Sequence, residues 1–155
     1  MQLLSLFDRP ATADCLKALW QPPTIAGLTE PLIGLREAQR NLSLKRLEDA
    51  KLLTVHWAEG TGELIALDAH PLLREYFARR AREQQPEAWR AAHRRFYEYL
   101  CTTTKEGDQP TLEELQPLYQ AVAHGCQAGL QQEAFIVLDA RIAPQSRGAA
   151  VTFLC

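Results

Sequence analysis

The sequence lacks most of the features that mark an enzyme, a metal protein or a membrane protein. It has no phosphate-binding loop of the form G-x-x-x-x-G-K-[ST], no nucleophile elbow G-x-S-x-G and no paired carboxylates on an expected cleft. Its four cysteines are far apart and form no C-x-x-C pair, so neither a zinc site nor a disulfide framework is expected. No apolar run approaches a membrane span. We therefore expect a cytoplasmic chain that is not an enzyme by itself and contains no cofactor or metal.

A strong charge of one sign is also missing. The net charge is −2, which is too small to hold nucleic acid or an anionic membrane by itself. Residues 1–70 contain seven Lys or Arg against nine Asp or Glu, whereas residues 71–105 contain eight against four. The basic excess is thus expected on the later helices. With 46% hydrophobic and 23% charged residues, the chain has the composition of a soluble globular protein of one or two small domains.

Neither end of the sequence has the signals of a complete domain. Met1 lies almost directly on an apolar helical turn with no cap before it, and residues 144–155 lose the helical period just after a helical hairpin begins. We expect a fragment or a truncated reading frame, with 144–155 as an irregular tail.

Residues 1–84 are expected to form one small domain. An apolar helical turn over 3–7 is followed by a helix over 13–20, for which Thr12 offers an N-cap oxygen. The prolines and glycines of 21–35 predict a connection with a brief turn around Leu32. A longer helix is expected over 36–51. Its inward residues are expected to be Leu35, Ala38, Leu42 and Leu47.

A β-hairpin follows the longer helix. Residues 53–57 alternate between apolar and polar, 59–62 have the composition of a turn, and 64–67 return as a second strand. Helices followed by a hairpin within 70 residues have the order of a winged helix, a relative of the helix-turn-helix fold. The hairpin would be its wing.

Residues 85–143 are expected to be helical, so the whole chain is classed as mainly α. Pro86 begins a helix with an apolar stripe at Trp89, Ala92, His93, Phe96 and Leu100. Thr111 and Glu114 form a capping box for the next helix, which Gly129 ends. The stripe of that helix is expected at Leu115, Leu118, Tyr119, Val122 and Cys126. Its antiparallel partner would turn Ala134, Phe135, Leu138 and Ile142 inward.

The junction between the second strand and the following helix holds the main candidate residue, His70. Backbone N–H groups at the start of a helix form an electropositive spot suited to phosphate. A single histidine at such a place is more often a cap or a packing residue. Asp68 is expected to cap the helix and to favour a protonated His70.

The run LDAHPLLREYF resembles the end of the winged-helix domain of STAND-class signalling ATPases, the nucleotide-switch family that includes NB-ARC and NACHT proteins. His70 matches the histidine of the family's Met-His-Asp motif, with Ala69 in place of the methionine and Pro71 in place of the aspartate. In the family this histidine touches the β-phosphate of bound ADP. The resemblance implies that His70 senses ADP or ATP in an intact protein whose NTPase domain lies upstream.

The run LYQAVAHGCQAGLQQEAF resembles a helical repeat of the tetratricopeptide (TPR) kind, with Ala134 at the close-packing position. Such arrays follow the winged helix in many STAND proteins and bind partners. The resemblance thus implies protein partners for the helical region. An unrelated helical hairpin is the alternative.

The alternative use of a winged helix is DNA binding by a transcription regulator with a helical dimerisation region. Its footprint would be Arg36, Arg40, Lys45 and Arg46. Interleaved acidic residues and the acidic wing oppose it, because phosphate contacts dominate affinity for DNA. A plain scaffold without any link to nucleotide is a third possibility. The sequence favours the first hypothesis, a regulatory and interaction segment of a STAND-type signal-transduction NTPase.

Overall fold

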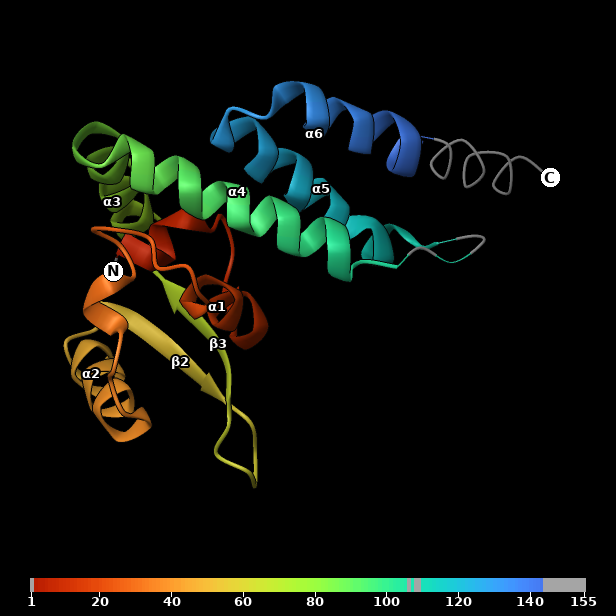
Figure 1. Cartoon of the computed structure of the whole chain (residues 1–155). Coiled ribbons are helices and arrows are strands. Elements are labelled where there is room, and N and C mark those ends of the chain that lie inside the picture. The colour runs from red at the N-terminus through yellow and green to blue at the C-terminus, as the bar shows by residue number, and fades with distance from the viewer. Residues whose placement is uncertain (1, 106, 108–109, 144–155) are drawn as a thin grey trace. The chain divides into compact units, whose positions relative to one another are not determined.

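The computed structural model describes residues 2–105, 107 and 110–143. The chain is mainly helical, with a small three-stranded antiparallel sheet (Figure 1). It divides into two compact units, Met1–Trp89 and Arg90–Cys155, and each is described by itself. The tail expected over 144–155 lies outside the described residues.

The first unit contains helices and strands in the order that the sequence predicts, with one addition. Its elements are the 3₁₀-helix η1 (Gln2–Leu6), strand β1 (Ala11–Thr12), α1 (Ala13–Trp20), the 3₁₀-helix η2 (Glu30–Leu32), α2 (Glu37–Asp49), β2 (Leu53–Trp57), β3 (Leu64–Ala69) and α3 (Pro71–Gln84). Thr12 caps α1 as predicted, because its hydroxyl accepts the N–H of Cys15. Strand β1 was not predicted, since two residues are too few for a recognisable alternation.

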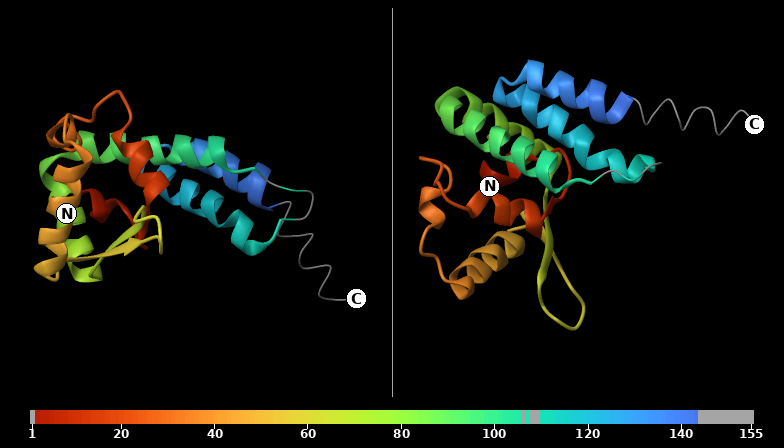
Figure 2. Two further views of the ribbon diagram at one scale, coloured as in Figure 1. Left: turned by 90° about the horizontal axis from the view of Figure 1, so that it is seen from below. Right: turned by 45° about the vertical axis from the view of Figure 1, so that its right-hand side comes forward.

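The sheet has the order β1-β3-β2, and both pairs are antiparallel. Strand β3 is central because Leu67 lies opposite Ala11 on one side and Val55 on the other. The hairpin of β2 and β3 is confirmed. The right view of Figure 2 shows its turn projecting away from the helices of the first unit.

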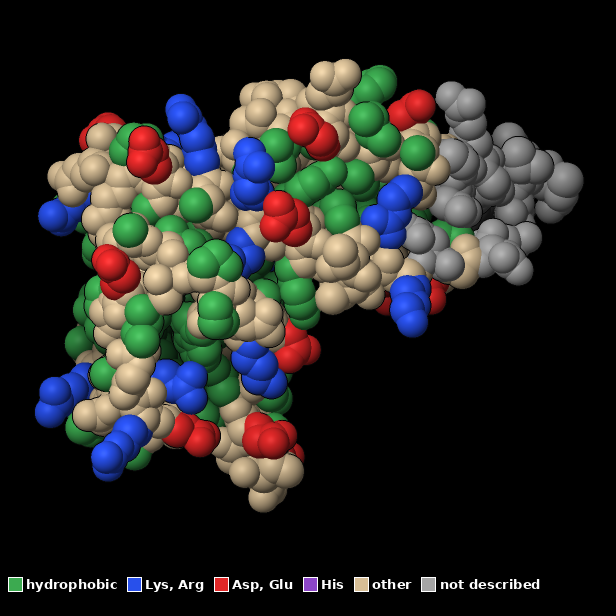
Figure 3. Space-filling view, in the orientation of Figure 1, with side chains coloured by type: hydrophobic (Ala, Val, Ile, Leu, Met, Phe, Trp, Pro, Cys, Tyr) green, Lys and Arg blue, Asp and Glu red, His purple; other side chains and the backbone are tan. Residues whose placement is uncertain are grey.

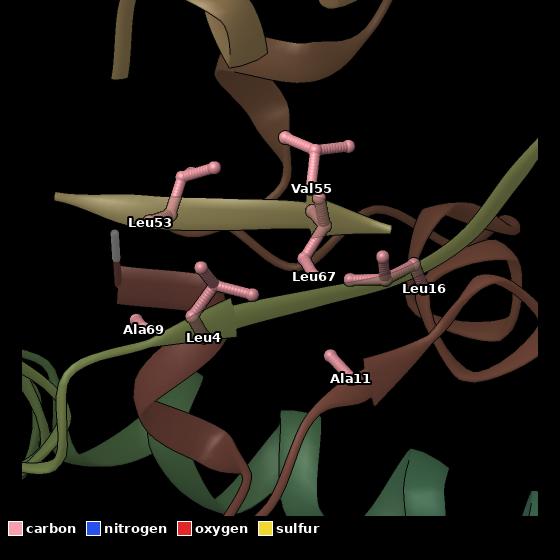
Figure 4. Packing of buried hydrophobic residues seen from close by; sticks show 7 residues of the cluster. All are labelled: Leu4, Ala11, Leu16, Leu53, Val55, Leu67 and Ala69. Atoms are coloured by element: carbon pink, nitrogen blue, oxygen red, sulfur yellow. The ribbon is translucent and has the colours of Figure 1, made fainter. Parts of the chain in front are cut away.

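One face of this sheet supplies a hydrophobic core to the first unit (Figure 4). Seven buried residues from η1, α1 and all three strands meet there: Leu4, Ala11, Leu16, Leu53, Val55, Leu67 and Ala69. In β2, the buried residues Leu53 and Val55 alternate with exposed Thr54 and His56. This period of two is why the hairpin was visible in the sequence.

Helix α2 contributes far less to this core than predicted. None of its residues is fully buried, Ala38 is exposed, and the side chain of Leu42 is 52% exposed. The prediction that Ala38 and Leu42 face inward is therefore wrong. Leu47, which was predicted to face inward, does pack against the core, as does Leu44, and each is only partly buried. The sequence analysis assigned apolar residues to the inner face of the helix by their type alone. In the structure, α2 contacts the core only through Leu44 and Leu47, and Leu42 lies outside it.

The second unit is a group of antiparallel helices. Helix α4 (Pro86–Thr103) begins in the first unit and continues into the second, where it is followed by α5 (Leu112–Ala128), α6 (Gln131–Val137) and a π-helical turn, η3 (Leu138–Ile142). The predicted capping box at the start of α5 is present: the Glu114 carboxylate accepts the N–H of Thr111 at 2.7 Å, and the Thr111 hydroxyl accepts the N–H of Glu114. Gly129 ends α5 with φ of 82°, which glycine adopts without strain.

The inward stripe predicted for α4 is confirmed, since all five of its residues are buried. The stripes of the next two helices were predicted in part. In α5, α6 and η3, Leu115, Leu118, Ala134 and Ile142 are buried, but Tyr119, Cys126, Phe135 and Leu138 are exposed. Their places are taken by the buried residues Ala121, Gly125, Ala128 and Val137. Small residues therefore form much of this contact, which a search for large apolar residues misses.

Among the described residues, no helix combines the length and the apolar character that crossing a membrane requires.

Candidate functional site: the junction of strand β3 and helix α3

Strand β3 passes into helix α3 through a single residue, His70. Its ring nitrogen Nδ1 accepts the backbone N–H of Leu72 at 3.2 Å, which makes His70 the N-cap of α3. Its carbonyl oxygen accepts the N–H groups of Leu73 and Arg74. Pro71 takes the first helical position, where its missing N–H costs no hydrogen bond. The capping interpretation of His70, one of the two that the sequence left open, thus describes its local contacts.

The capping bond also orients the imidazole of His70. Because Nδ1 accepts a hydrogen bond, the proton of the neutral ring is on Nε2. His70 is exposed, so an acceptor on another molecule or domain has access to this N–H.

Asp68 does not cap α3, contrary to the prediction. Its Oδ1 accepts the N–H of the adjacent Ala69 at 2.8 Å and lies 3.4 Å from Nη2 of Arg74. The carboxylate is therefore bound at the end of β3 and pairs with a cation one turn into the helix. The predicted effect of Asp68 on His70 stays a prediction.

Arg74 is a member of this junction that the sequence analysis did not single out. Its side chain is only 14% exposed, and one guanidinium nitrogen is occupied by Asp68. The other, Nη1, is shielded from solvent and has no acceptor among the described residues. A buried donor without an acceptor costs about 1–3 kcal/mol. The signal in the sequence was its spacing of four from His70, which places both residues on one side of α3.

The basic residues proposed for DNA contact all lie on or beside α2, but they do not all face solvent freely. Arg36 precedes the helix and donates its N–H to Gln39. The guanidinium of Arg40 lies over the ring of Trp20, 4.9 Å from its centroid. Lys45 and Arg46 are exposed. In Figure 3, the basic side chains of the lower part of the first unit lie mainly on the left, where α2 lies, and acidic ones lie toward the hairpin.

The second unit contains a pair of histidines that the sequence did not predict. Nδ1 of His93 on α4 lies 2.7 Å from Nδ1 of His124 on α5, and the two rings are 4.9 Å apart. Phe96 packs against the His124 ring. His93 was predicted to be packed, which its 3% exposure confirms, but no partner was predicted for His124. The two are 31 residues apart, so no local pattern relates them.

Two histidines alone do not complete a metal site. Throughout the described ranges, no group of three or more His, Cys, Asp or Glu is placed to hold a metal ion.

The chain was compared with protein-family models, with curated proteins and with solved structures, and none of the three comparisons found a match. The function is therefore argued from the residues and their geometry.

Proposed function

We propose that this chain is a non-catalytic regulatory and interaction segment of a STAND-type signal-transduction NTPase. In this proposal the first unit is a winged helix that relays the nucleotide state of an upstream domain. The helical second unit is TPR-like and binds protein partners. The observation that supports it most is the junction of β3 with α3, where the exposed imidazole of His70 caps the helix and Arg74 pairs with Asp68 beside it.

The order of elements supports the winged-helix part of the proposal. Strand β1 lies between η1 and α1, and the two α-helices α1 and α2 precede the hairpin. Strand β1 pairs with β3, the second strand of the hairpin, so that β3 is the central strand of the sheet. A third strand beside the hairpin fits a winged helix better than the two strands that the sequence predicted.

The chemistry of the junction supports a role in sensing phosphate. A helix N-terminus has a partial positive charge, and anions are bound there by N–H groups. The exposed imidazole of His70 would add a side-chain donor for a phosphate of ADP or ATP, and the positive charge of Arg74 lies one turn into the same helix. The nucleotide itself would be held by the upstream domain.

The packing of α5 on α6 supports the TPR-like part. A Cβ added to Gly125 would lie only 2.9 Å from Cβ of Ala134, so the two helices approach closely at small residues. Ala134 is the position at which the resemblance implies close packing.

The first test is to read the encoding DNA several hundred codons upstream of Met1 for an in-frame strand, phosphate loop and helix. If G-x-x-x-x-G-K-[ST] is present, the intact protein should retain ADP after purification, and His70→Ala should release it. His70→Asn is the matched variant, because asparagine keeps an N-cap acceptor. If His70→Asn also releases ADP, the loss of ADP is due to the missing imidazole and not to the loss of the N-cap of α3.

His56→Ala, on the exposed side of β2, is the control for loss of a surface histidine. A start at Met1 with its own ribosome site and no phosphate loop would contradict the proposal. So would measurable ATP turnover by the 155-residue chain itself.

DNA binding is retained as a second candidate because α2 has no fully buried residue and presents Arg36, Lys45 and Arg46. Salt-sensitive binding to duplex DNA that falls in Arg40→Ala and Arg46→Ala would support it. Unchanged mobility of duplex DNA at low salt would exclude it.

A further inference from the structure

A groove separates helix α2 from the β2–β3 hairpin in the first unit. It encloses about 510 Å³ and is open to solvent. Leu42 and Trp57 supply apolar side chains to it, and Lys45, Glu48 and Asp49 supply charged ones. The groove is separate from the junction at His70, and the inference drawn from it does not depend on a nucleotide.

The apolar side chains in this groove are exposed to an unusual degree. Leu42 is 52% exposed and Trp57 is 38% exposed. Neither side chain belongs to the hydrophobic core of the first unit. Leaving a leucine or tryptophan in water forgoes roughly 25 cal/mol for every Å² that burial would remove. A tryptophan and a leucine facing one groove are therefore suited to receive an apolar side chain from a partner.

The charges of the groove favour a basic partner. Its charged side chains are two carboxylates and one ammonium group, which leaves an acidic excess. Glu48 already accepts the N–H of Val55, whereas Asp49 and Lys45 take part in no ion pair within the described part of the chain. The turn of the hairpin adds Glu59 and no Lys or Arg. Asp49 is thus the acceptor most available to a cation.

We propose that this groove docks a peptide segment of a partner protein, with an aliphatic side chain between Leu42 and Trp57 and an Arg or Lys paired with Asp49. A phosphate backbone is a poor occupant, because the acidic excess would repel it and its strands have no apolar side chain for the leucine and tryptophan. Of the four basic residues that sequence analysis assigned to DNA, only Lys45 lines this groove.

The test uses the ¹⁵N-labelled full chain and two synthetic octapeptides, one alternating Leu with Arg and one alternating Leu with Glu. The Leu/Arg peptide should shift the indole N–H signal of Trp57 and the amide signals of α2, with saturation. The Leu/Glu peptide should bind at least about tenfold more weakly, a difference of about 1.4 kcal/mol. Asp49→Lys should reverse this preference, and Asp14→Lys, an exposed acidic residue on α1, should leave it unchanged.

Leu42→Ala should weaken both peptides without loss of folding, since Leu42 is outside the core. Leu72→Ala is its control, because Leu72 is a 68% exposed leucine on α3. The proposal is overturned if neither peptide shifts these signals at millimolar concentration, or if Asp49→Lys binds the Leu/Arg peptide as well as the parent chain does. It is equally overturned if duplex DNA shifts the same signals and the Leu/Arg peptide does not.

Discussion

The Oε1 atom of Glu48 accepts a hydrogen bond from the backbone N–H of Val55, at 3.0 Å. Strand β2 is an edge strand, since the sheet has the order β1-β3-β2. Unpaired N–H groups along such an edge invite pairing with another chain. Glu48 reaches from α2 to the strand seven residues later and occupies this donor. This hydrogen bond links α2 to β2, and α2 itself has no fully buried side chain to make that link.

Replacing Glu48 should therefore expose the edge of the sheet. We expect Glu48→Ala to lower the free energy of unfolding by about 1–2 kcal/mol, because Val55 loses its acceptor in a partly buried place. The variant should also aggregate faster at high protein concentration. Urea unfolding and light scattering measure the two effects. Asp49→Ala, on the same helix, is the control, and an equal loss in both variants would contradict the role given to Glu48.

Arg141 is expected to stabilise the second unit through the end of α4. Its guanidinium donates to the carbonyl oxygens of Cys101 and Thr104, both at 2.8 Å, where the helix leaves carbonyls unpaired. Arg141→Ala should cost about 1.5–3 kcal/mol, since both bonds involve a charged donor. Arg141→Lys should recover part of the loss, because lysine supplies charge without the two-pronged geometry. Thermal unfolding compares them with Arg94→Ala, an exposed arginine, and a loss as large in Arg94→Ala would refute the assignment.

Gly125 is expected to tolerate no side chain. The added Cβ of Gly125→Ala would meet Cβ of Ala134 at 2.9 Å and the ring of Tyr97 at 3.0 Å. Overpacking of this kind costs about 1–3 kcal/mol, which exceeds the gain of up to about 1 kcal/mol from better helix propensity. Combining it with Ala134→Gly should recover stability relative to the sum of the single changes. Additive effects in this double-mutant cycle would show that the two residues are not in contact.

The capping box of α5 predicts a dependence on acid. Hydrogen bonds from the backbone and hydroxyl of Thr111 hold the pKa of the Glu114 carboxyl below its ordinary value. A lowered pKa means that the carboxylate stabilises the fold at neutral pH and that this contribution is lost as the pH falls through the lowered value. The urea midpoint should fall less between pH 5 and pH 2 in Glu114→Gln than in the parent chain. The same reduction in Glu113→Gln would remove the reason for assigning the effect to the box.

The parts of the fold that were predicted correctly are those determined by neighbours in the sequence. Thr12, the Thr111 and Glu114 box and Gly129 act over one helical turn, so residue type and spacing suffice to place them. The alternation of apolar and polar residues in β2 is also a local pattern, so it could be recognised in the sequence. His70 was also found locally, because its capping role depends only on the two residues after it.

The parts that were missed depend on what lies across space. Strand β1 exists only because Ala11 and Thr12 pair with β3, some 55 residues later. Leu42 was placed inside by its apolar character, although α2 turns it toward the hairpin groove. Arg74 became a member of the junction through its pairing with Asp68, and no pattern of residue types shows which atom of a guanidinium lacks an acceptor.

The two histidines between α4 and α5 constrain each other's tautomers, because their Nδ1 atoms lie 2.7 Å apart. When both rings are neutral, one carries its proton on Nδ1 and donates it to Nδ1 of the other, which then carries its own proton on Nε2. The contact between α4 and α5 thus needs two different forms of the same residue type.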